Sequence, residues 1–353
     1  MVGADNDPSL TATSGPLMRA AGAGQLVMMM MMQIVFIGIG AGAATALLFA
    51  SVASGSIISV LLFYLAPLPI LIAVLGWSHW AGIIAATGAA IALAAVFGSV
   101  FFFAFLIGVG LPAWWLGYLA MLARPASNGG ANALVWYPPG RLVVWAALLG
   151  TLVVIAAIPN FGLDEESFRA GLRRGFERLL RVQTGLPANS PLVIPGVTDT
   201  NRLIEFFITV IPAAAAVLST ITNTVNLWLA ARVVKFSGRL RRPWPEIPAM
   251  TFPGSIAALL AAATAGTFVP GLVGVAAMLL CASLLIAFGV LGLAVLHAIT
   301  KGMDSRGFVL AGVYAAVFIF GWPMLLFSLL GLLEIAFDIR SRLARKRGPP
   351  ART

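Results

Sequence analysis

The chain has 353 residues, enough for two soluble domains, but its composition excludes a water-soluble protein. Hydrophobic residues make up 60% of the sequence and charged residues only 10%, whereas a soluble domain is about one-quarter charged. So few ionised groups cannot cover the surface of a soluble fold. The mean hydropathy of +1.00 agrees, and we therefore expect an integral membrane protein.

Charged residues are missing from five long stretches, which predict the membrane spans. A spanning helix needs about 20 apolar residues, so the 104 residues between Arg19 and Arg124 can hold four spans. The stretch 247–300 can hold two, and each of the other three can hold one. We expect helices near residues 27–50, 57–75, 80–97, 100–122, 142–158, 203–231, 253–269, 271–298 and 308–333.

The predicted fold is an all-α, polytopic membrane bundle of eight or nine transmembrane helices plus one interfacial amphipathic helix. Polar segments at both ends and in the middle divide the chain. The expected parts are a disordered tail 1–24, an N-terminal bundle of about five spans 25–158, an extramembrane segment 159–202, a C-terminal bundle of three or four spans 203–335 and a basic tail 336–353.

The orientation in the membrane follows from Lys and Arg, which are in excess in cytoplasmic loops. Nine spans place 10 of these residues on one side and 12 on the other, which decides nothing. The helix 253–269 is the weakest of the nine, and without it the two sides carry 14 and 8. We therefore prefer eight spans, with both termini on the cytoplasmic side of a bacterial inner membrane.

The net charge of +10 then faces the anionic lipid headgroups of the bilayer. We expect no nucleic acid partner, because the basic residues lie in short loops beside the membrane and not in a folded basic domain.

Residues 164–184 predict a helix lying at the membrane surface. Asp164 can cap its start and Gly185 can end it. Five arginines point mostly away from its apolar stripe, as in an interfacial helix. The stripe consists of Phe168, Leu172, Phe176, Leu179 and Leu180. Such a helix either anchors the chain to headgroups or acts as a lid or docking helix between the two bundles.

Two predicted helices carry a small residue at every fourth position, a pattern that lets helices pack closely in a membrane. The first ladder consists of Gly38, Gly42, Ala46 and Ala50, and continues to Ser54. The second consists of Gly82, Ala86, Ala90, Ala94 and Gly98. The simplest interpretation is that the first helix packs on the third within the chain. The alternative is that the first ladder is a docking face for another membrane protein.

The densest polar group at membrane depth lies in the helix 203–231, where Asn223 and Asn226 share a face. Bonding to another helix is the simplest interpretation. Alternatively, these side chains face an apolar solute cavity with aromatic walls. The candidate ligand-binding residues are then Asn223, Asn226, Thr222, His79, Trp80, Trp114 and Tyr118.

No motif predicts catalysis, a metal site or a cofactor. His79 and His297 have no carboxylate beside them in the long apolar stretches, so they do not make a metal site. The patterns HExxH, GxSxG and GxxxxGK[ST] are absent from the sequence. Cys281 is the single cysteine and cannot form a disulfide within the chain. We expect no enzymatic activity.

The C-terminal half resembles a known family in the order of its features. A basic loop ends in Pro245-Glu246-Ile247-Pro248, and two apolar helices follow. The last helix ends in Leu329-Leu330-Gly331-Leu332-Leu333-Glu334, before Asp338-Ile339-Arg340-Ser341-Arg342. This order is similar to the YybS-like bacterial predicted membrane proteins, domain-of-unknown-function family 2232, over about residues 25–340.

That group is similar in fold to the substrate-binding S components of energy-coupling-factor transporters, which take up vitamins and metals. The resemblance implies a solute-binding component that works with a membrane coupling protein and an ATPase, with the ladder Gly38, Gly42, Ala46 and Ala50 as docking face. This chain departs from that pattern by its larger number of spans and by the inserted segment 159–202.

Two functions remain open. The first is a transport-related protein that binds a small apolar solute without hydrolysing ATP itself. The second is a membrane scaffold or assembly factor that organises partner proteins or lipids without transporting anything.

Overall fold

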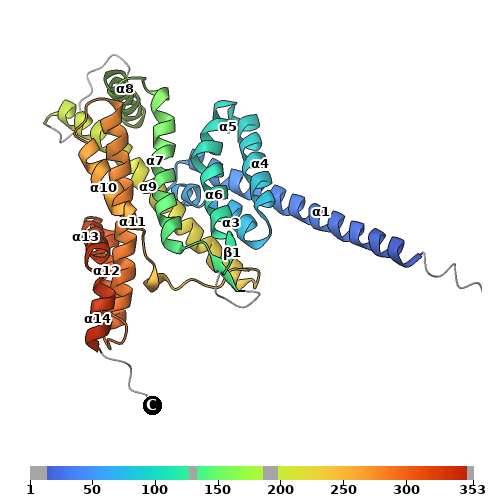
Figure 1. Ribbon diagram of the computed structural model, residues 1–353. Helices are drawn as coiled ribbons and strands as arrows, with labels where there is room; N and C mark the ends of the chain where they lie inside the picture. Colours follow the sequence, from blue (N-terminus) through green and yellow to red (C-terminus); the bar gives the residue numbers. More distant parts are fainter. Residues whose placement is uncertain (1–13, 127–132, 186–197, 348–353) are drawn as a thin grey trace, which may run out of the picture.

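The structure is a computed structural model that describes residues 14–126, 133–185 and 198–347. These segments are almost entirely helical (Figure 1). The longer helices are α1 (Ser14–Ala50), α2 (Ile57–Tyr64), α3 (Pro67–Gly76), α4 (His79–Phe97), α5 (Val100–Phe105), α6 (Leu111–Ala120), α7 (Pro139–Ala157), α8 (Glu165–Thr184), α9 (Thr200–Phe236), α10 (Ser255–Gly266), α11 (Leu272–Ile299), α12 (Arg306–Phe320), α13 (Pro323–Phe337) and α14 (Ile339–Arg347).

Short elements connect these helices. A π-helical turn, Leu106–Gly110, joins α5 to α6, and 3-10 turns occur at Ser51–Ser54, Ile158–Asn160 and Ile247–Ala249. The strands β1 (Ala123–Pro125) and β2 (Leu134–Trp136) form an antiparallel hairpin.

Seven helices or helix pairs are long and apolar enough to cross a membrane, which agrees with an all-α polytopic membrane protein. Five of them fall within 25–158 and its immediate boundaries, where about five spans are predicted. The predicted total of eight or nine is not reached by this criterion. The seven are Gly24–Ser54, Ile57–Gly76, His79–Phe97, Val100–Ala120, Pro139–Asn160, Thr200–Phe236 and Leu272–Ile299.

The expectation of one span over 308–333 is wrong. The chain breaks at Gly321, whose φ of 70° lies in the left-handed region, and Pro323 then begins α13 without an N–H to continue the preceding helix. Each of α12 and α13 has 15 residues, or about 22 Å at 1.5 Å per residue. Neither reaches across the roughly 30 Å of a hydrocarbon core.

The N-terminal tail also differs from its prediction in part. Residues 14–24 are not disordered but form the start of α1, while residues 1–13 lie outside the described part of the chain. The first half of α1 projects from the body of the molecule (Figure 1). Its apolar side chains, including Met28 to Met32, are exposed there, which suits a helix surrounded by lipid.

The helix predicted at 253–269 is shorter than expected, because α10 has only 12 residues. The chain around it nevertheless passes from one end of the molecule to the other. At one end, the carbonyl of Pro248 accepts a hydrogen bond from Arg340 in α14. At the other, the backbone N–H of Gly271 donates to Glu165 of α8.

These contacts define two ends of the molecule, the α8 end and the basic end. The basic end holds the β1–β2 hairpin, the loop 237–254 and α14 (Figure 1). Helices α7 and α9 connect the two ends, and so does α11. Helix α12 leads away from the basic end and α13 returns to it, so α14 lies at the basic end (Figure 1).

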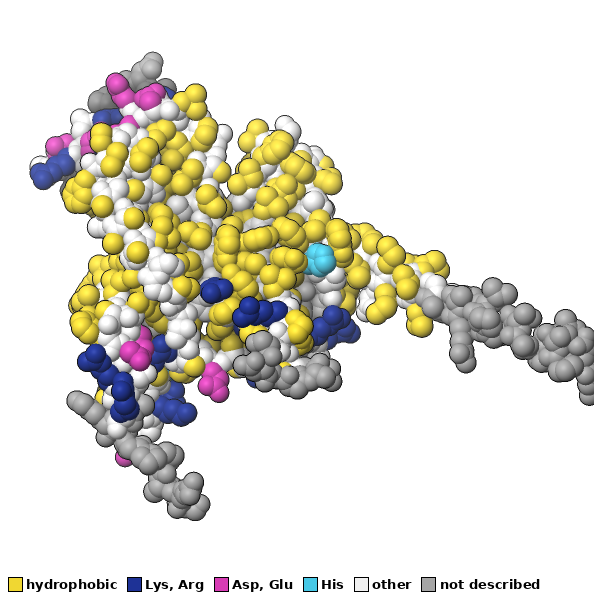
Figure 2. Space-filling view, viewed as in Figure 1, with side chains coloured by type: hydrophobic (Ala, Val, Ile, Leu, Met, Phe, Trp, Pro, Cys, Tyr) yellow, Lys and Arg dark blue, Asp and Glu magenta, His cyan; other side chains and the backbone are white. Residues whose placement is uncertain are grey.

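Charge is distributed unevenly between these ends (Figure 2). Six Lys or Arg and six Asp or Glu lie at the α8 end, between Asp164 and Glu205. At the basic end, 12 described Lys or Arg side chains accompany four described carboxylates. The 12 are Arg124, Arg141, Arg232, Lys235, Arg239, Arg241, Arg242, Lys301, Arg306, Arg340, Arg342 and Arg345.

The small-residue ladders pack within the chain but not on each other. A Cβ built on Gly38 or Gly42 would clash with α4, where it would meet Ile84 or the carbonyl of Ala85. In the second ladder, a Cβ on Gly82 would instead meet Val74 of α3. The α4 residues that contact α1, Ile84 and Ala85, thus differ from Gly82, which contacts α3. The face with Gly38 and Gly42 is therefore covered by α4 and not free for a partner protein.

Helix α9 joins the two predicted bundles into one packed unit. Ala230 and Val234 near its C-terminal end belong to a core shared with α3, α4 and α6. Ala216, nearer its start, packs with Ile158 and with Leu279 of α11. One 37-residue helix therefore links the segments 25–158 and 203–335.

Candidate solute-binding site

Helix α8 forms as its sequence predicts. Its start is a capping box in which the Ser167 backbone N–H donates to Asp164 Oδ1 at 2.8 Å. This hydrogen bond, together with one from the Ser167 hydroxyl, holds the pKa of the Asp164 carboxyl below its usual value. Gly185 ends the helix with a φ of 67°. The termini of α8 are thus set by local chemistry.

The apolar side of α8 is partly buried against the protein. Phe168 is buried, and the rings of Phe176 and Phe207 of α9 lie 5.1 Å apart. Gly171 has no room for a side chain, because a Cβ there would clash with the backbone of Phe161. Leu179 remains half exposed. The stripe therefore docks α8 onto the bundle and leaves only its later residues for lipid.

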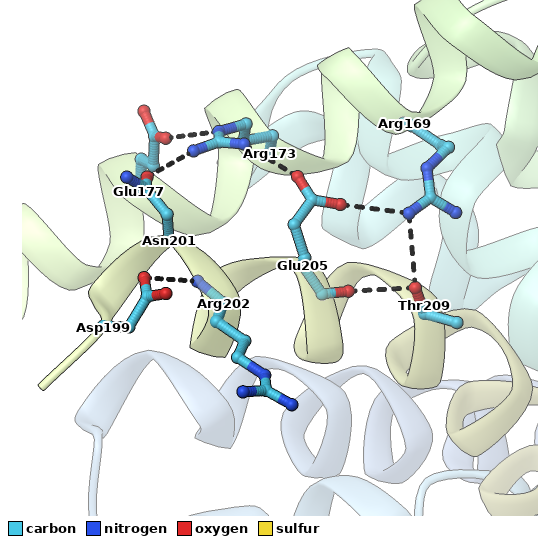
Figure 3. Close-up of polar contacts among 8 residues, drawn as sticks. All are labelled: Arg169, Arg173, Glu177, Asp199, Asn201, Arg202, Glu205 and Thr209. Atoms are coloured by element: carbon cyan, nitrogen blue, oxygen red, sulfur yellow. Dashed lines mark hydrogen bonds and ion pairs between the residues drawn. The ribbon is translucent and has the colours of Figure 1, made fainter. Parts of the chain in front are cut away.

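A polar cluster fixes the other side of α8 to the start of α9 (Figure 3). Glu205 of α9 receives Arg169 on one oxygen at 3.0 Å and Arg173 on the other at 2.7 Å. Arg173 also pairs with Glu177 at 2.9 Å and donates to Asn201 at 2.6 Å. Ion pairs this exposed contribute little to stability. Their geometry instead fixes the register between α8 and α9.

A second contact ties the first turn of α8 to the turn before α11. Glu165 Oε2 accepts a hydrogen bond from the backbone N–H of Gly271 at 2.8 Å. Gly271 has a φ of 83°, which glycine adopts without strain. Helix α8 therefore touches both α9 and the α10–α11 turn, and it covers the space between them.

A cavity of about 370 Å³ lies in that space. Its floor is apolar, with Ile208 and Pro212 from α9 and Val275 and Met278 from α11. Its lining also includes the polar residues Glu165, Arg169 and Thr209, and the exposed ring of Phe268. This volume, and a mostly apolar lining with a few polar groups, are those of small-molecule sites.

Pro212 adds a further polar group to the cavity. Proline has no N–H, so the carbonyl of Ile208, four residues earlier in α9, lacks its usual helical donor. Both residues line the cavity. This carbonyl is therefore a candidate acceptor for a hydrogen-bond donor on a ligand.

The predicted asparagines lie elsewhere and are buried. The Asn226 amide donates to the carbonyls of Tyr64 and Thr222, each at 2.8 Å. Tyr64 O is available because the chain breaks before Pro67 and the Leu68 N–H bonds to Leu65 instead. Asn226 therefore forms a hydrogen bond to another helix, as the simpler of the two interpretations predicts.

Asn223 has a weaker bond, in which its amide donates to Ser219 Oγ at 3.4 Å. The Oδ1 atom of Asn226 is buried without a partner. Both side chains are buried, and Asn226 contacts the end of α2. A role for Asn223, Asn226 or Thr222 in ligand binding stays a prediction.

The predicted aromatic residues do lie together. His79 lies 4.9 Å from Trp80 and 5.6 Å from Tyr118, and Tyr118 stacks on Trp114 at 5.9 Å, measured between ring centroids. They gather beyond the C-terminal end of α3, whereas Asn226 contacts the chain just before its start. The 10 residues of α3 span about 15 Å, so the asparagines and the aromatic residues do not line one site.

Sequence reasoning did not identify the residues of the α8 cavity or the ion pairs beside it. Arg169 and Arg173 are four residues apart and so share a helix face, which was a usable signal. Their common partner Glu205 lies beyond the segment 186–197, and nothing in the sequence specifies that pairing. Within the described parts of the chain, no three His, Cys, Asp or Glu side chains gather as a metal site requires.

At the basic end, the two segments that carry the family resemblance meet in space. Arg340 Nε pairs with Glu334 Oε1 at 2.7 Å, and Arg340 Nη1 donates to the carbonyl of Pro248 at 2.6 Å. The Glu334 side chain is only 5% exposed. This contact, the Glu334–Arg340–Pro248 clamp, joins the end of α13 to the loop before α10.

The family model described as "Predicted membrane protein (DUF2232)" matches residues 43–335, well over half of the chain. The chain belongs to this family. Most of the clamp and the whole α8 cavity fall within the residues that DUF2232 covers, whereas Arg340 lies just beyond them. No curated protein and no solved structure matches the chain.

Proposed function

We propose that the protein is a transport-related membrane component that binds a small, largely apolar solute in the cavity beneath α8 and does not hydrolyse ATP itself. The observation that carries this proposal is the cavity, with its mostly apolar lining and the polar residues Glu165, Arg169 and Thr209. A solute with an apolar body and one polar end matches that lining. Helix α8 acts as its lid.

The distribution of charge supports an orientation for this site. Cytoplasmic loops carry the excess of Lys and Arg, and 12 such side chains lie at the basic end against six at the α8 end. Both termini then lie in the cytoplasm, and the inner membrane of a bacterium places α8 on its outer face. The cavity would then lie on the outer face of the membrane, the side from which an imported solute arrives.

Uptake through such a site needs an energy source outside this chain. The likeness to S components suggests a membrane coupling protein and an ATPase as partners. Because α4 covers Gly38 and Gly42, those partners would dock on another surface. Ala46 packs in the same core, so the ladder serves mainly to hold α1 on α4.

The scaffold function is the second candidate, and the free side of α8 favours it. Arg174 and Arg178 are exposed there, and Val182 is 76% exposed. A partner protein could bind this surface without any solute in the cavity. The two functions differ in what should accompany the purified protein.

The orientation predicts which introduced cysteines react from outside the cell. In a Cys281→Ser background, Arg178→Cys on α8 should be labelled in intact cells by a membrane-impermeant maleimide. Asp304→Cys, in the loop between α11 and α12, should react only after the membrane is opened. Labelling of Asp304→Cys alone in intact cells would reverse the proposed orientation.

The solute proposal predicts that filling the cavity removes a bound molecule. Met278→Trp places a large side chain among the lining residues, so a small molecule that accompanies the purified wild-type protein should fall at least about tenfold, the effect of 1.4 kcal/mol. Mass spectrometry of the denatured, purified protein measures it. Val273→Trp is the matched control, because Val273 lies on the same helix but is 65% exposed.

Equal loss in both variants, or lipid alone in all samples, would contradict solute binding at this cavity. A protein that accompanies the wild type and is lost on Arg174→Glu/Arg178→Glu would then favour the scaffold.

A further inference from the structure

A second cavity, of about 460 Å³, lies at the basic end. It is formed by the β1–β2 hairpin and the first turn of α7. Arg124 and Arg141 line it, together with the rings of Trp136 and Tyr137 and the apolar side chain of Val135. It is separate from the α8 cavity, which lies at the opposite end of α7.

The two arginines come from different elements and carry uncompensated charge. Arg124 lies on β1 opposite Val135 of β2, and Arg141 lies in the first turn of α7. Both are exposed, and neither side chain forms an ion pair or hydrogen bond with another described residue. Two guanidinium groups therefore face one cavity without a carboxylate between them.

A third guanidinium lies behind the cavity wall. Arg242 is only 9% exposed, and it donates to the carbonyls of Tyr137 at 2.7 Å and Ala120 at 3.0 Å. It has no carboxylate partner among the described residues. Burial lowers the pKa of Arg242 from its usual value, since these carbonyls do not fully offset the loss of solvent.

The helix that begins at the cavity adds to this positive potential. The N-terminal end of α7 carries the positive end of the helix dipole, and no acidic residue lies in its first turn. Three guanidinium groups and a helix start thus surround Tyr137 and Pro138. An anion at this place would interact favourably with all of them.

The position of the cavity indicates which anion. Leu134 and Val135 are half exposed beside it, and α7 continues from it as a membrane span. Trp and Tyr rings such as Trp136 and Tyr137 are typical of the headgroup level of a bilayer. An anion held there borders both the aqueous phase and the hydrocarbon, as a lipid phosphate does.

We propose that this cavity binds the phosphate group of an anionic phospholipid, with Arg124 and Arg141 as the direct ligands and Arg242 fixing the position of Tyr137 between them. Guanidinium groups bind phosphate through paired, charge-assisted hydrogen bonds. The apolar residues beside the cavity receive the acyl chains. This site is independent of solute binding beneath α8.

Native mass spectrometry of the full-length protein in detergent tests the site, with dioleoylphosphatidylglycerol as the probe and dioleoylphosphatidylcholine as the neutral-headgroup comparison. The wild type should bind one phosphatidylglycerol at least about tenfold more tightly than phosphatidylcholine. R124Q/R141Q should lose that preference. R174Q/R178Q removes the same charge from exposed positions on α8 and should keep it.

A variant that keeps the charge separates the phosphate site from a folding effect. R124K/R141K should retain a preference between those of the wild type and of R124Q/R141Q, because Lys binds phosphate as a point charge. An unchanged preference in R124Q/R141Q overturns the proposal. So does an equal loss in R174Q/R178Q, or displacement of the lipid by excess inorganic phosphate, which would identify a soluble ligand instead.

Discussion

Arg340→Ala should lower the free energy of unfolding by about 3–5 kcal/mol, which is the cost of removing one partner of a buried ion pair. The Glu334 side chain is 5% exposed and that of Arg340 16% exposed, so the remaining carboxylate cannot recover its hydration. The backbone N–H of Arg340, at 3.2 Å from Glu334 Oε2, is then its only described partner. The carbonyl of Pro248 also loses its donor.

Thermal unfolding in detergent, followed by intrinsic tryptophan fluorescence, measures this loss. Arg345→Ala is the matched control, because Arg345 is exposed in the same helix and its one hydrogen bond, to Ser341 O, is 3.4 Å long. Glu334→Leu/Arg340→Met should be more stable than Arg340→Ala alone, since it leaves no buried charge. Equal melting of Arg340→Ala and Arg345→Ala would show that the clamp contributes nothing.

The clamp also explains why the two resemblance segments are distant in sequence yet belong together. The loop before α10 has no helix of its own to hold it, apart from the turn Ile247–Ala249. Its attachment to Arg340 fixes the point from which the chain crosses toward the α8 end. Phe252 then packs on Phe288 of α11, with ring centroids 5.5 Å apart. Disturbing the clamp should therefore also disturb α10.

Local chemistry made parts of this structure predictable. Helix α8 begins after Asp164 and ends before Gly185, as expected, because its capping groups act within one turn. The turn at Gly98 follows for a similar reason, since its φ of 101° favours glycine. Long uncharged stretches also indicated most spans, because the cost of burying charge in hydrocarbon acts at every position.

The failures have a common physical cause. The stretch 308–333 is uniformly apolar, so the absence of charge gave no sign that the chain breaks at Gly321 and Pro323. Arg242 and Glu334 look like ordinary loop and helix-end charges in the sequence. Their burial depends on carbonyls and an arginine supplied by other segments, and such long-range pairings leave no local pattern.

The candidate sites also divide into features that local sequence predicts and features that depend on long-range contacts. The sequence placed His79, Trp80, Trp114 and Tyr118 around one cavity with the asparagines, whereas only the four ring side chains lie together. It could not show that α8 folds back over α9 and the α10–α11 turn, which creates the cavity. Nor could it show that Arg141 would share a cavity with Arg124.

Gly331→Ala should destabilise the protein by about 1–3 kcal/mol, the usual effect of overfilling a packed interior. Helices α11 and α13 cross so closely that a Cβ on Gly331 would clash with the backbone carbonyl of Phe288, and one on Gly292 would clash with Phe327. Backbone atoms cannot turn away as the end of a long side chain can. The two helices would have to separate, and Ser328 would lose its 2.6 Å hydrogen bond to Leu285 O.

Gly312→Ala is the matched control for this crossing, because it makes the same change in α12 where no atom lies within 4 Å of the added Cβ. It should leave the melting temperature unchanged or raise it slightly, since Ala favours a helix over Gly by about 1 kcal/mol. Thermal unfolding in one detergent compares the two variants directly. If Gly331→Ala melts at the same temperature as Gly312→Ala, then α13 does not pack on α11 at this distance.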